Sequence, residues 1–232
     1  MSGFLGGLGQ YLGRFNQAFI ITIELSIVSL IIATIIGIVV GLINTSKSKS
    51  FIIKILKAIG NLYIYIIRGT PMLVQILIIY FGLAQVLRPT GFSWINVGGT
   101  FCAGVVALSL NAGAYMAEIV RAGIEAVDIG QVEAARSLGL PYSKTMKKII
   151  LPQALRTMLP SIINQFIISI KDTSLLSAIG LAELTNIGKT IASSQSSQIM
   201  AVYCLMACYY LIMCTVLAKV AKIVEKRLSY GK

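Results

Sequence analysis

Long apolar runs alternate with short polar or charged segments along the whole chain. Each run is close to the length of about 20 residues that a helix needs to cross the hydrocarbon core of a bilayer. The pattern predicts an all-α fold, a polytopic membrane helical bundle with five transmembrane helices in one domain over residues 1–232. The predicted spans are residues 18–43, 71–87, 101–121, 157–179 and 198–218.

Composition agrees with a membrane protein. Hydrophobic residue types make up 56% of the chain and charged types 12%, with a mean hydropathy of +0.85, whereas an ordinary soluble domain carries about 25% charged residues. A soluble globular fold is therefore excluded. The excess of Lys and Arg lies between the apolar runs, which indicates membrane orientation and argues against a nucleic-acid partner. The chain has no histidine, so we expect no zinc or haem site and no cofactor in this chain.

The cations also indicate which way the chain crosses the membrane. Lys and Arg near span ends accumulate on the cytoplasmic side, and here sixteen lie in one set of loops and three in the other. We predict an N-terminus outside, a cytoplasmic C-terminus and hence an odd number of spans. The larger set is Lys47, Lys49, Lys54, Lys57, Arg68, Arg121, Arg136, Lys144, Lys147, Lys148, Arg156, Lys219, Lys222, Lys226, Arg227 and Lys232, and the smaller is Arg14, Arg88 and Lys189.

Two further features concern helix packing. Residues 51–66 are apolar but contain Lys54 and Lys57, which favours an amphipathic helix lying at the inner membrane surface; a longer, tilted span that starts near Gly60 is the alternative. In the first span, small residues recur every fourth position and predict a close contact with another helix. They are Ser29, Ala33, Gly37 and Gly41.

The longest predicted cytoplasmic segment, residues 123–156, carries a helical pattern of its own. Ile129 to Leu138 suits a short helix that Gly139 ends, and a second helix follows Ser143 until Pro152 interrupts it. We interpret the pair as a compact projection below the membrane that docks on a partner. An interfacial segment that follows the lipid surface is the alternative.

This segment resembles the EAA loop in the transmembrane subunits of ABC importers. The matching positions are Glu133, Ala134, Ala135, Gly139, Ile149, Leu151 and Pro152. Arg68-Gly69-Thr70-Pro71 before the second span and Lys171-Asp172-Thr173-Ser174-Leu175 within the fourth look like the branch of these subunits that takes up histidine, arginine or glutamine.

The resemblance implies a type I ABC importer-like permease in the cytoplasmic (inner) membrane of a bacterium. Its implied partners are an ABC ATP-binding subunit, a second permease subunit and an extracytoplasmic amino-acid-binding protein, with a homodimer favoured and a heterodimer possible. The chain lacks the phosphate-binding motif G-x-x-x-x-G-K-[ST], so we expect ATP and magnesium on the partner and no enzyme activity here. The ATPase-coupling residues implied are Gly130, Glu133, Ala134, Ala135, Gly139, Ile149, Leu151 and Pro152.

Two carboxylates lie inside predicted spans, where charge is costly and marks a transport pathway or a packed ion pair. Helical rise places Glu24 about 9 Å and Asp172 roughly 8 Å below the outer boundary. We predict a substrate cavity in which both acids attract a cationic amino acid, and Asn111, Asn164 and Gln165 add hydrogen bonds. Structural neutralisation of one acid, by Lys171 or another cation, is the alternative.

Two other charged positions are interpreted as structural. Glu118 lies one turn from Arg121 near the inner edge of the third span, which predicts a local ion pair. Arg68 is expected to anchor the inner interface.

The combined interpretation is uptake of polar, basic amino acids by ATP-driven alternating access. An ion-gradient-driven secondary amino acid transporter is the main alternative, since acids within a membrane also bind H⁺ or Na⁺. An ion channel or an assembly scaffold fits less well, because the sequence shows no pore loop and a scaffold leaves the two acids without a role.

Overall fold

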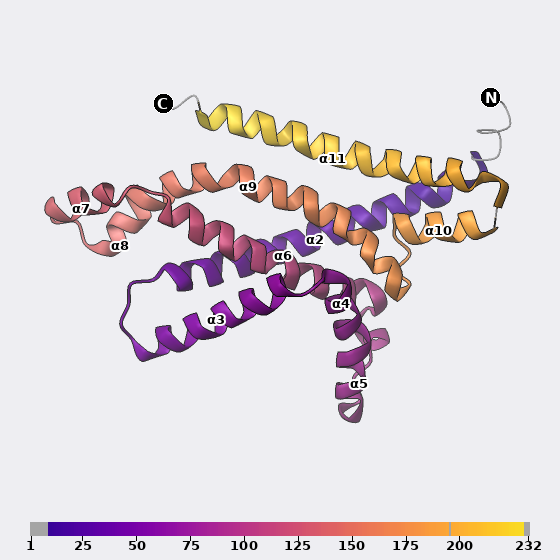
Figure 1. The fold of residues 1–232 in the computed structure, drawn as a ribbon, viewed down its shortest axis with the longest axis horizontal. Helices are drawn as coiled ribbons and strands as arrows, with labels where there is room; N and C mark the ends of the chain where they lie inside the picture. The colour runs from indigo at the N-terminus through magenta and orange to yellow at the C-terminus, as the bar shows by residue number, and fades with distance from the viewer. Residues whose placement is uncertain (1–8, 195, 230–232) are drawn as a thin grey trace.

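The computed structural model describes residues 9–194 and 196–229, which contain helices and turns but no strand. Five helical stretches are long and apolar enough to cross a membrane, which confirms the predicted five-span, all-α fold. These stretches are Gly9–Thr45, Met72–Thr90, Gly99–Glu125, Tyr142–Ile179 and Ile199–Lys226. Four long helices run along the longest axis of the molecule in Figure 1: α2 (Leu12–Thr45), α6 (Gly99–Glu125), α9 (Leu151–Asp172) and α11 (Ile199–Ser229).

Helix α6 is the centre of the bundle, and its most extensive contact is with α2. The predicted stripe of small residues on α2 is buried along its whole length. A Cβ atom added at Gly41 would lie 2.7 Å from Cβ of Val120 and 2.9 Å from the carbonyl oxygen of Ala117. The Ser109 hydroxyl donates to the Ser29 carbonyl oxygen at 3.2 Å. The absence of larger side chains therefore sets how closely the two backbones approach.

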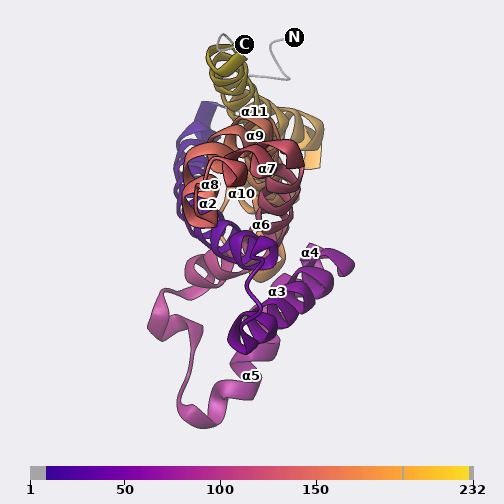
Figure 2. The same cartoon turned by 90° about the vertical axis from the view of Figure 1, so that its left-hand side faces the viewer.

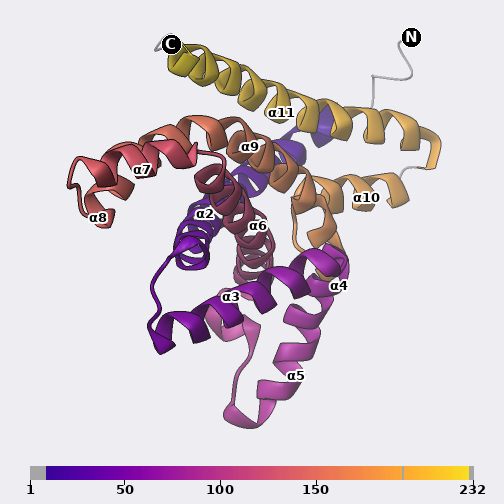
Figure 3. The same cartoon turned by 60° about the vertical axis from the view of Figure 1, so that its left-hand side comes forward.

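The predicted helix over residues 51–66 is present as α3 (Phe51–Gly69), and it packs against the bundle on one face, with Gly60 and Ile64 buried. It turns back at the α2–α3 connection and runs toward the middle of the bundle (Figures 1 and 3). Tyr63 donates to the Leu110 carbonyl oxygen at 2.5 Å, and the Asn44 amide donates to Asn61 at 2.9 Å. Gly60 faces Asn44 closely enough that an added Cβ would lie 3.0 Å from its side-chain oxygen. The small face at Gly60 allows this packing. Among the described residues, α3 is not one of the five candidate spans, and a break at Thr70-Pro71 separates it from the span that begins at Met72. The structure therefore does not support the alternative of one longer span from Gly60.

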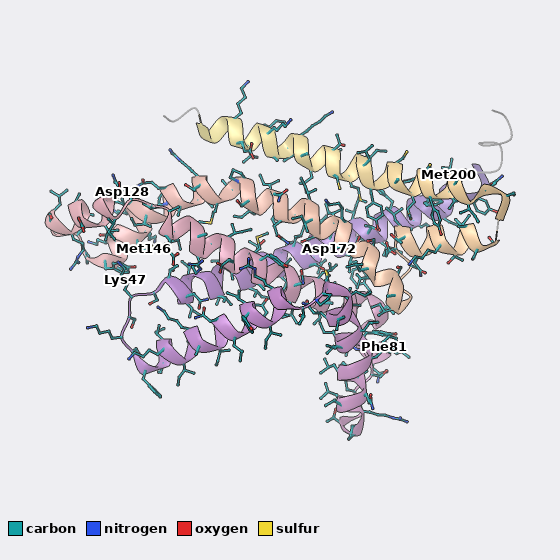
Figure 4. All side chains as sticks on the ribbon, viewed as in Figure 1. Lys47, Phe81, Asp128, Met146, Asp172 and Met200 are labelled. Carbon is teal, nitrogen blue, oxygen red and sulfur yellow. The ribbon has the colours of Figure 1, made fainter. Side chains whose placement is uncertain are left out.

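The chain breaks at Arg68-Gly69-Thr70-Pro71 and continues as an arm. The arm consists of α4 (Met72–Leu77), the π-helical turn η2 (Ile78–Gly82), α5 (Leu83–Leu87) and η3 (Arg88–Thr90). It leaves the bundle steeply and carries Phe81 outward (Figures 1, 2 and 4). The Gln75 amide closes the break by donating to the carbonyl oxygens of Ile67 at 2.8 Å and Thr70 at 3.0 Å. A side chain thereby satisfies carbonyl groups that the broken helix leaves free.

The structure also corrects the expected interruption at Pro152. Helix α8 (Tyr142–Thr145), the π-helical turn η5 (Met146–Ile150) and α9 form one uninterrupted helical stretch. The N–H of Leu151 donates to the carbonyl oxygen of Met146, five residues back. This wider turn lies directly before Pro152 and accommodates a proline that has no N–H to donate.

The other end of the bundle contains η4 (Trp94–Val97), η6 (Thr173–Ile179), α10 (Leu184–Ser194) and η7 (Ser196–Gln198). Glu183 directly precedes α10, and its side chain is fully buried. The carboxylate accepts the N–H groups of Thr185 at 2.8 Å and Asn186 at 2.7 Å, as an N-cap does. It also accepts the Tyr210 hydroxyl of α11 at 3.0 Å, so one side chain both starts α10 and fastens it to α11.

Glu183 lies outside the five candidate spans. Burial raises the pKa of the Glu183 carboxyl above its ordinary value, and the hydrogen bonds from Thr185, Asn186 and Tyr210 oppose that rise. The Glu183 carboxyl therefore contributes most to the free energy of unfolding at pH values below the ordinary pKa of a glutamic acid. This contribution is lost as the pH rises through the raised pKa.

We expect Gly41→Leu to destabilise the protein by about 1–3 kcal/mol, because the added side chain overpacks the α2–α6 contact. Thermal unfolding of the purified protein in detergent should show a Tm several degrees lower. The control is Gly13→Leu on the same helix, since no atom lies within 4 Å of a Cβ added at Gly13. Equal Tm values for the two variants would contradict the close contact.

We expect Glu183→Gln to remove a pH-dependent part of the stability. As the pH rises above about 4.5, the ordinary value for a glutamic acid, the wild-type Tm should fall relative to that of the variant. Thr185→Val removes a hydroxyl partner but keeps the carboxyl, so it should retain the wild-type pH dependence. A Tm difference between wild type and Glu183→Gln that is constant across pH would argue against this assignment.

Candidate functional site

The predicted cytoplasmic helix is present as α7 (Ile129–Ser137), and both of its ends are capped. At its start, the Asp128 carboxylate accepts the Gly130 N–H at 2.7 Å. At its end, Gly139 adopts φ +77°. The Gly139 N–H donates to Arg136 at 3.0 Å, and the Leu140 N–H donates to Ala135 at 3.1 Å, which is the Schellman arrangement. The sequence therefore defines a short rigid helix, as predicted.

The α7–α8 hairpin, residues 128–145, lies beyond one end of the bundle, and Figure 2 views it end on. Two large apolar side chains on it are exposed, Ile129 at 60% and Leu138 at 82%. Such side chains on a projection outside the spans indicate a surface that a partner covers.

The candidate coupling residues divide into two groups. Gly130, Glu133, Ala134, Gly139 and Pro152 are exposed. Ala135 is buried, and Ile149 and Leu151 pack against a cluster that joins α6 to α9. The first group provides a surface, and the second attaches the hairpin to the spans. The cluster consists of Val120, Ile124, Ile150, Ala154 and Met158.

The two predicted substrate carboxylates are accessible. Glu24 is exposed on α2, and Asp172 is half-buried where α9 passes into η6 (Figure 4). Every ion pair found among the described residues involves Glu118 or Glu125. Within that part of the chain, Glu24 and Asp172 therefore form no direct ion pair, and the neighbouring Lys171 is exposed.

The three predicted amides have different surroundings. Asn164 is exposed on α9. Asn111 is buried and donates to the side-chain oxygen of Gln75 at 2.9 Å, next to the helix break. Gln165 is buried and donates to the Ser169 hydroxyl at 3.5 Å. The hydrogen bonds of the described residues thus link none of the five candidate substrate residues to one another in this conformation.

A cavity with mixed polar and apolar lining, here named the Arg68 cavity, lies instead nearer the hairpin, between the end of α3, α6 and α9. Its volume is about 370 Å³. The predicted pair is present on its wall, where the Glu118 carboxylate accepts Arg121 Nε at 3.1 Å and Nη2 at 2.5 Å. Arg68 joins this pair with Nη1 at 3.7 Å from Glu118 Oε1. Arg68 thus faces a cavity as well as ending α3, which the sequence did not reveal.

Glu183 is a buried carboxyl that the sequence pattern did not indicate. Glutamate is not among the residues usually found at helix N-caps, and the position lies between predicted spans. The one local signal was an acidic residue directly before a helical pattern.

Comparison with known proteins shows three similarities. Residues 33–230 match the family described as "Binding-protein-dependent transport system inner membrane component". The arginine transport system permease protein ArtQ of Bacillus subtilis is 38% identical over 213 residues, 92% of this chain and 91% of that protein. The L-cystine transport system permease protein TcyB of the same organism is 39% identical over 209 residues, 90% of this chain and 83% of that protein.

A solved structure agrees with this result. The crystal structure of an amino acid ABC transporter with histidines contains a chain that superposes with a TM-score of 0.84 at 38% identity, covering 97% of this chain and 98% of that one. The chain therefore belongs to the family of inner membrane components of binding-protein-dependent transport systems and is a transport subunit, not an enzyme.

Proposed function

We propose that this chain is the permease subunit of an ATP-driven importer that moves polar, basic amino acids into the cell. Family membership and the names of the similar permeases support an amino acid ABC importer. In our proposal two copies of the chain form the pathway, because one chain carries both the hairpin and the carboxylates. An extracytoplasmic binding protein delivers the substrate.

The observation that carries the proposal is the α7–α8 hairpin. Its exposed surface includes Ile129 and Leu138, and its attachment to α6 and α9 is a packed apolar cluster. In this proposal a separate ATP-binding subunit, which holds ATP and magnesium, binds this surface. It moves the hairpin as a rigid body. Because packed cores transmit displacement, α6 and α9 move with it, and this motion produces alternating access.

The position of Lys47, which belongs to the larger set of loop cations, supports the proposed orientation in the inner membrane. Lys47 lies at the same end of the molecule as Asp128, where the hairpin begins, and Met200 lies at the other end (Figure 4). In our proposal the end with the hairpin is cytoplasmic. Helix α2 then starts outside and α11 ends in the cytoplasm.

Substrate selection is assigned to the unpaired acids Glu24 and Asp172. A carboxylate near the membrane interior that lacks a protein cation favours a cationic ligand. Asn164 is exposed on the same helix as Asp172 and supplies a hydrogen bond. Asn111 and Gln165 hold helix positions in this conformation, so our proposal gives them substrate contacts only when α6 and α9 separate.

We expect Glu24→Gln and Asp172→Asn each to reduce arginine uptake by the reconstituted complex by about tenfold or more, equivalent to about 1.4 kcal/mol. Uptake of glutamine, whose side chain is neutral, should fall less. The control is Glu125→Gln, which removes a carboxylate at the inner end of α6 and should leave the preference for arginine unchanged. Equal arginine uptake by all variants would contradict the assignment of the two acids.

We expect Glu133→Lys to insert into the membrane normally but to lose co-purification with the ATP-binding subunit, because it reverses a charge on the exposed face of α7. Lys219→Glu reverses an exposed charge on α11 and should leave co-purification intact. Retained association and transport in Glu133→Lys would count against docking through this face.

A further inference from the structure

The Arg68 cavity between α3, α6 and α9 has features of a ligand site. Its polar lining residues are Arg68 at the end of α3, Tyr115 and Glu118 of α6, and Thr157 and Ser161 of α9. This cavity shares none of its lining residues with the five proposed substrate residues, so its role needs a separate argument. The inference below rests on the proposed function.

Tyr115 and Glu118 hold the Arg68 guanidinium in place without accepting a hydrogen bond from it. Its central carbon lies 5.5 Å from the centre of the Tyr115 ring, and its closest approach to Glu118 is 3.7 Å, longer than a hydrogen bond. Arg121 occupies both oxygens of the Glu118 carboxylate. Among the described residues the Arg68 side chain donates no hydrogen bond, and it is 43% exposed. Apart from its long ion pair with Glu118, its planar set of N–H donors therefore stays available, in the geometry that binds a carboxylate through two hydrogen bonds.

Helix α9 contributes hydroxyl groups to the same cavity. Ser161 is exposed on α9, and its hydroxyl has no partner among the described residues. The Thr157 hydroxyl donates to the Gln153 carbonyl oxygen at 3.3 Å. A carboxylate bound in the cavity thus has a guanidinium, Arg68, and a hydroxyl donor, Ser161, among the groups that line its site.

We propose that this cavity is an inner substrate site, in which Arg68 binds the α-carboxylate of the transported amino acid and Ser161 donates a hydrogen bond to it. Arginine and cystine, the substrates named for two similar permeases, differ in their side chains but share this carboxylate. The site therefore recognises the common part of the substrate, and Glu24 and Asp172 select the side chain.

The two sites act in succession. Asp172 lies eleven residues beyond Ser161 on the same helical stretch, or about 16 Å at 1.5 Å per residue. This separation exceeds the length of an extended arginine molecule, so one molecule does not contact both. A substrate entering from the outer end meets the acids first and the Arg68 cavity second.

The test measures equilibrium binding to the complete permease–ATPase complex in nanodiscs of phosphatidylcholine, without the binding protein. The ligands are radiolabelled arginine and agmatine, which has the same side chain but no carboxylate. Agmatine carries one more net positive charge than arginine, so the binding measurements use a Glu24→Gln, Asp172→Asn background that removes the outer acids, and wild type in these measurements means that background without a further change. Wild type should bind arginine at least tenfold more tightly than agmatine. Arg68→Gln should lose at least tenfold in arginine affinity with agmatine affinity unchanged, and Ser161→Ala should lose less. Arg88→Gln removes an exposed arginine on the distant arm and should behave as wild type.

Several outcomes would overturn the site. In the first, wild type binds arginine and agmatine equally well. In the second, Arg68→Gln still prefers arginine. In the third, Arg68→Gln loses affinity for both ligands equally, which is the result that a purely structural role of Arg68 predicts. A preference that disappears when phosphatidylglycerol replaces phosphatidylcholine would assign Arg68 to lipid phosphate instead. Uptake of arginine by the wild-type complex with ATP and binding protein is measured in parallel. If the wild-type complex takes up no arginine, the proposed function is contradicted. If it takes up arginine but Arg68→Gln keeps the preference for arginine over agmatine, the inner site alone is contradicted.

Discussion

The close contact of α2 with α6 is the constraint on which the rest of the arrangement depends. Apolar side chains gain little by leaving lipid for one another, so helices in a membrane associate through dense packing and hydrogen bonds. Small residues on α2 let α6 approach until backbone and Cβ atoms meet at Gly41. With one face fixed there, α6 offers its remaining faces to α3 and α9. The Arg68 cavity forms where those two helices border α6.

Irregular backbone occurs where the fold changes direction or leaves the bilayer. Between α3 and α4 the Gln75 amide replaces missing helical hydrogen bonds and is itself held by Asn111. The π-helical turns at Ile78–Gly82 and Met146–Ile150 interrupt regular α-helix in the arm and directly before Pro152. Polar side chains within the membrane thus serve first to satisfy backbone groups, which explains why Asn111 is buried in a structural role in this conformation.

The sequence predicted features that depend on local pattern. Five apolar runs gave the five spans, Asp128 and Gly139 marked the ends of α7, and the four-residue repeat on α2 identified its packing face. Features that depend on three-dimensional placement were not accessible. For residues 51–66 the pattern predicted a helix, but it did not reveal that Tyr63 contacts α6 and Gly60 contacts α2. Pro152 was expected to break a helix because sequence does not reveal a π turn.

For the site residues, too, the sequence predicted what depends on local spacing and not what depends on contacts between distant parts of the chain. Helical spacing placed Asn164 and Gln165 near one face of α9, but a difference of one position exposes the first and buries the second. Glu118 and Arg121 were paired correctly because they are one turn apart, whereas Arg68 reaches Glu118 from fifty residues away in sequence. Long-range proximity of this kind also places Tyr210 on Glu183.

The central claim is that this subunit is a gate moved by a separate ATPase. The most direct measurement is accumulation of labelled arginine against a gradient in proteoliposomes that contain the purified chain alone, compared with the chain plus ATP-binding subunit, binding protein and ATP. The account predicts accumulation only in the complete system. Uphill accumulation by the chain alone, driven by a proton or sodium gradient, would contradict it.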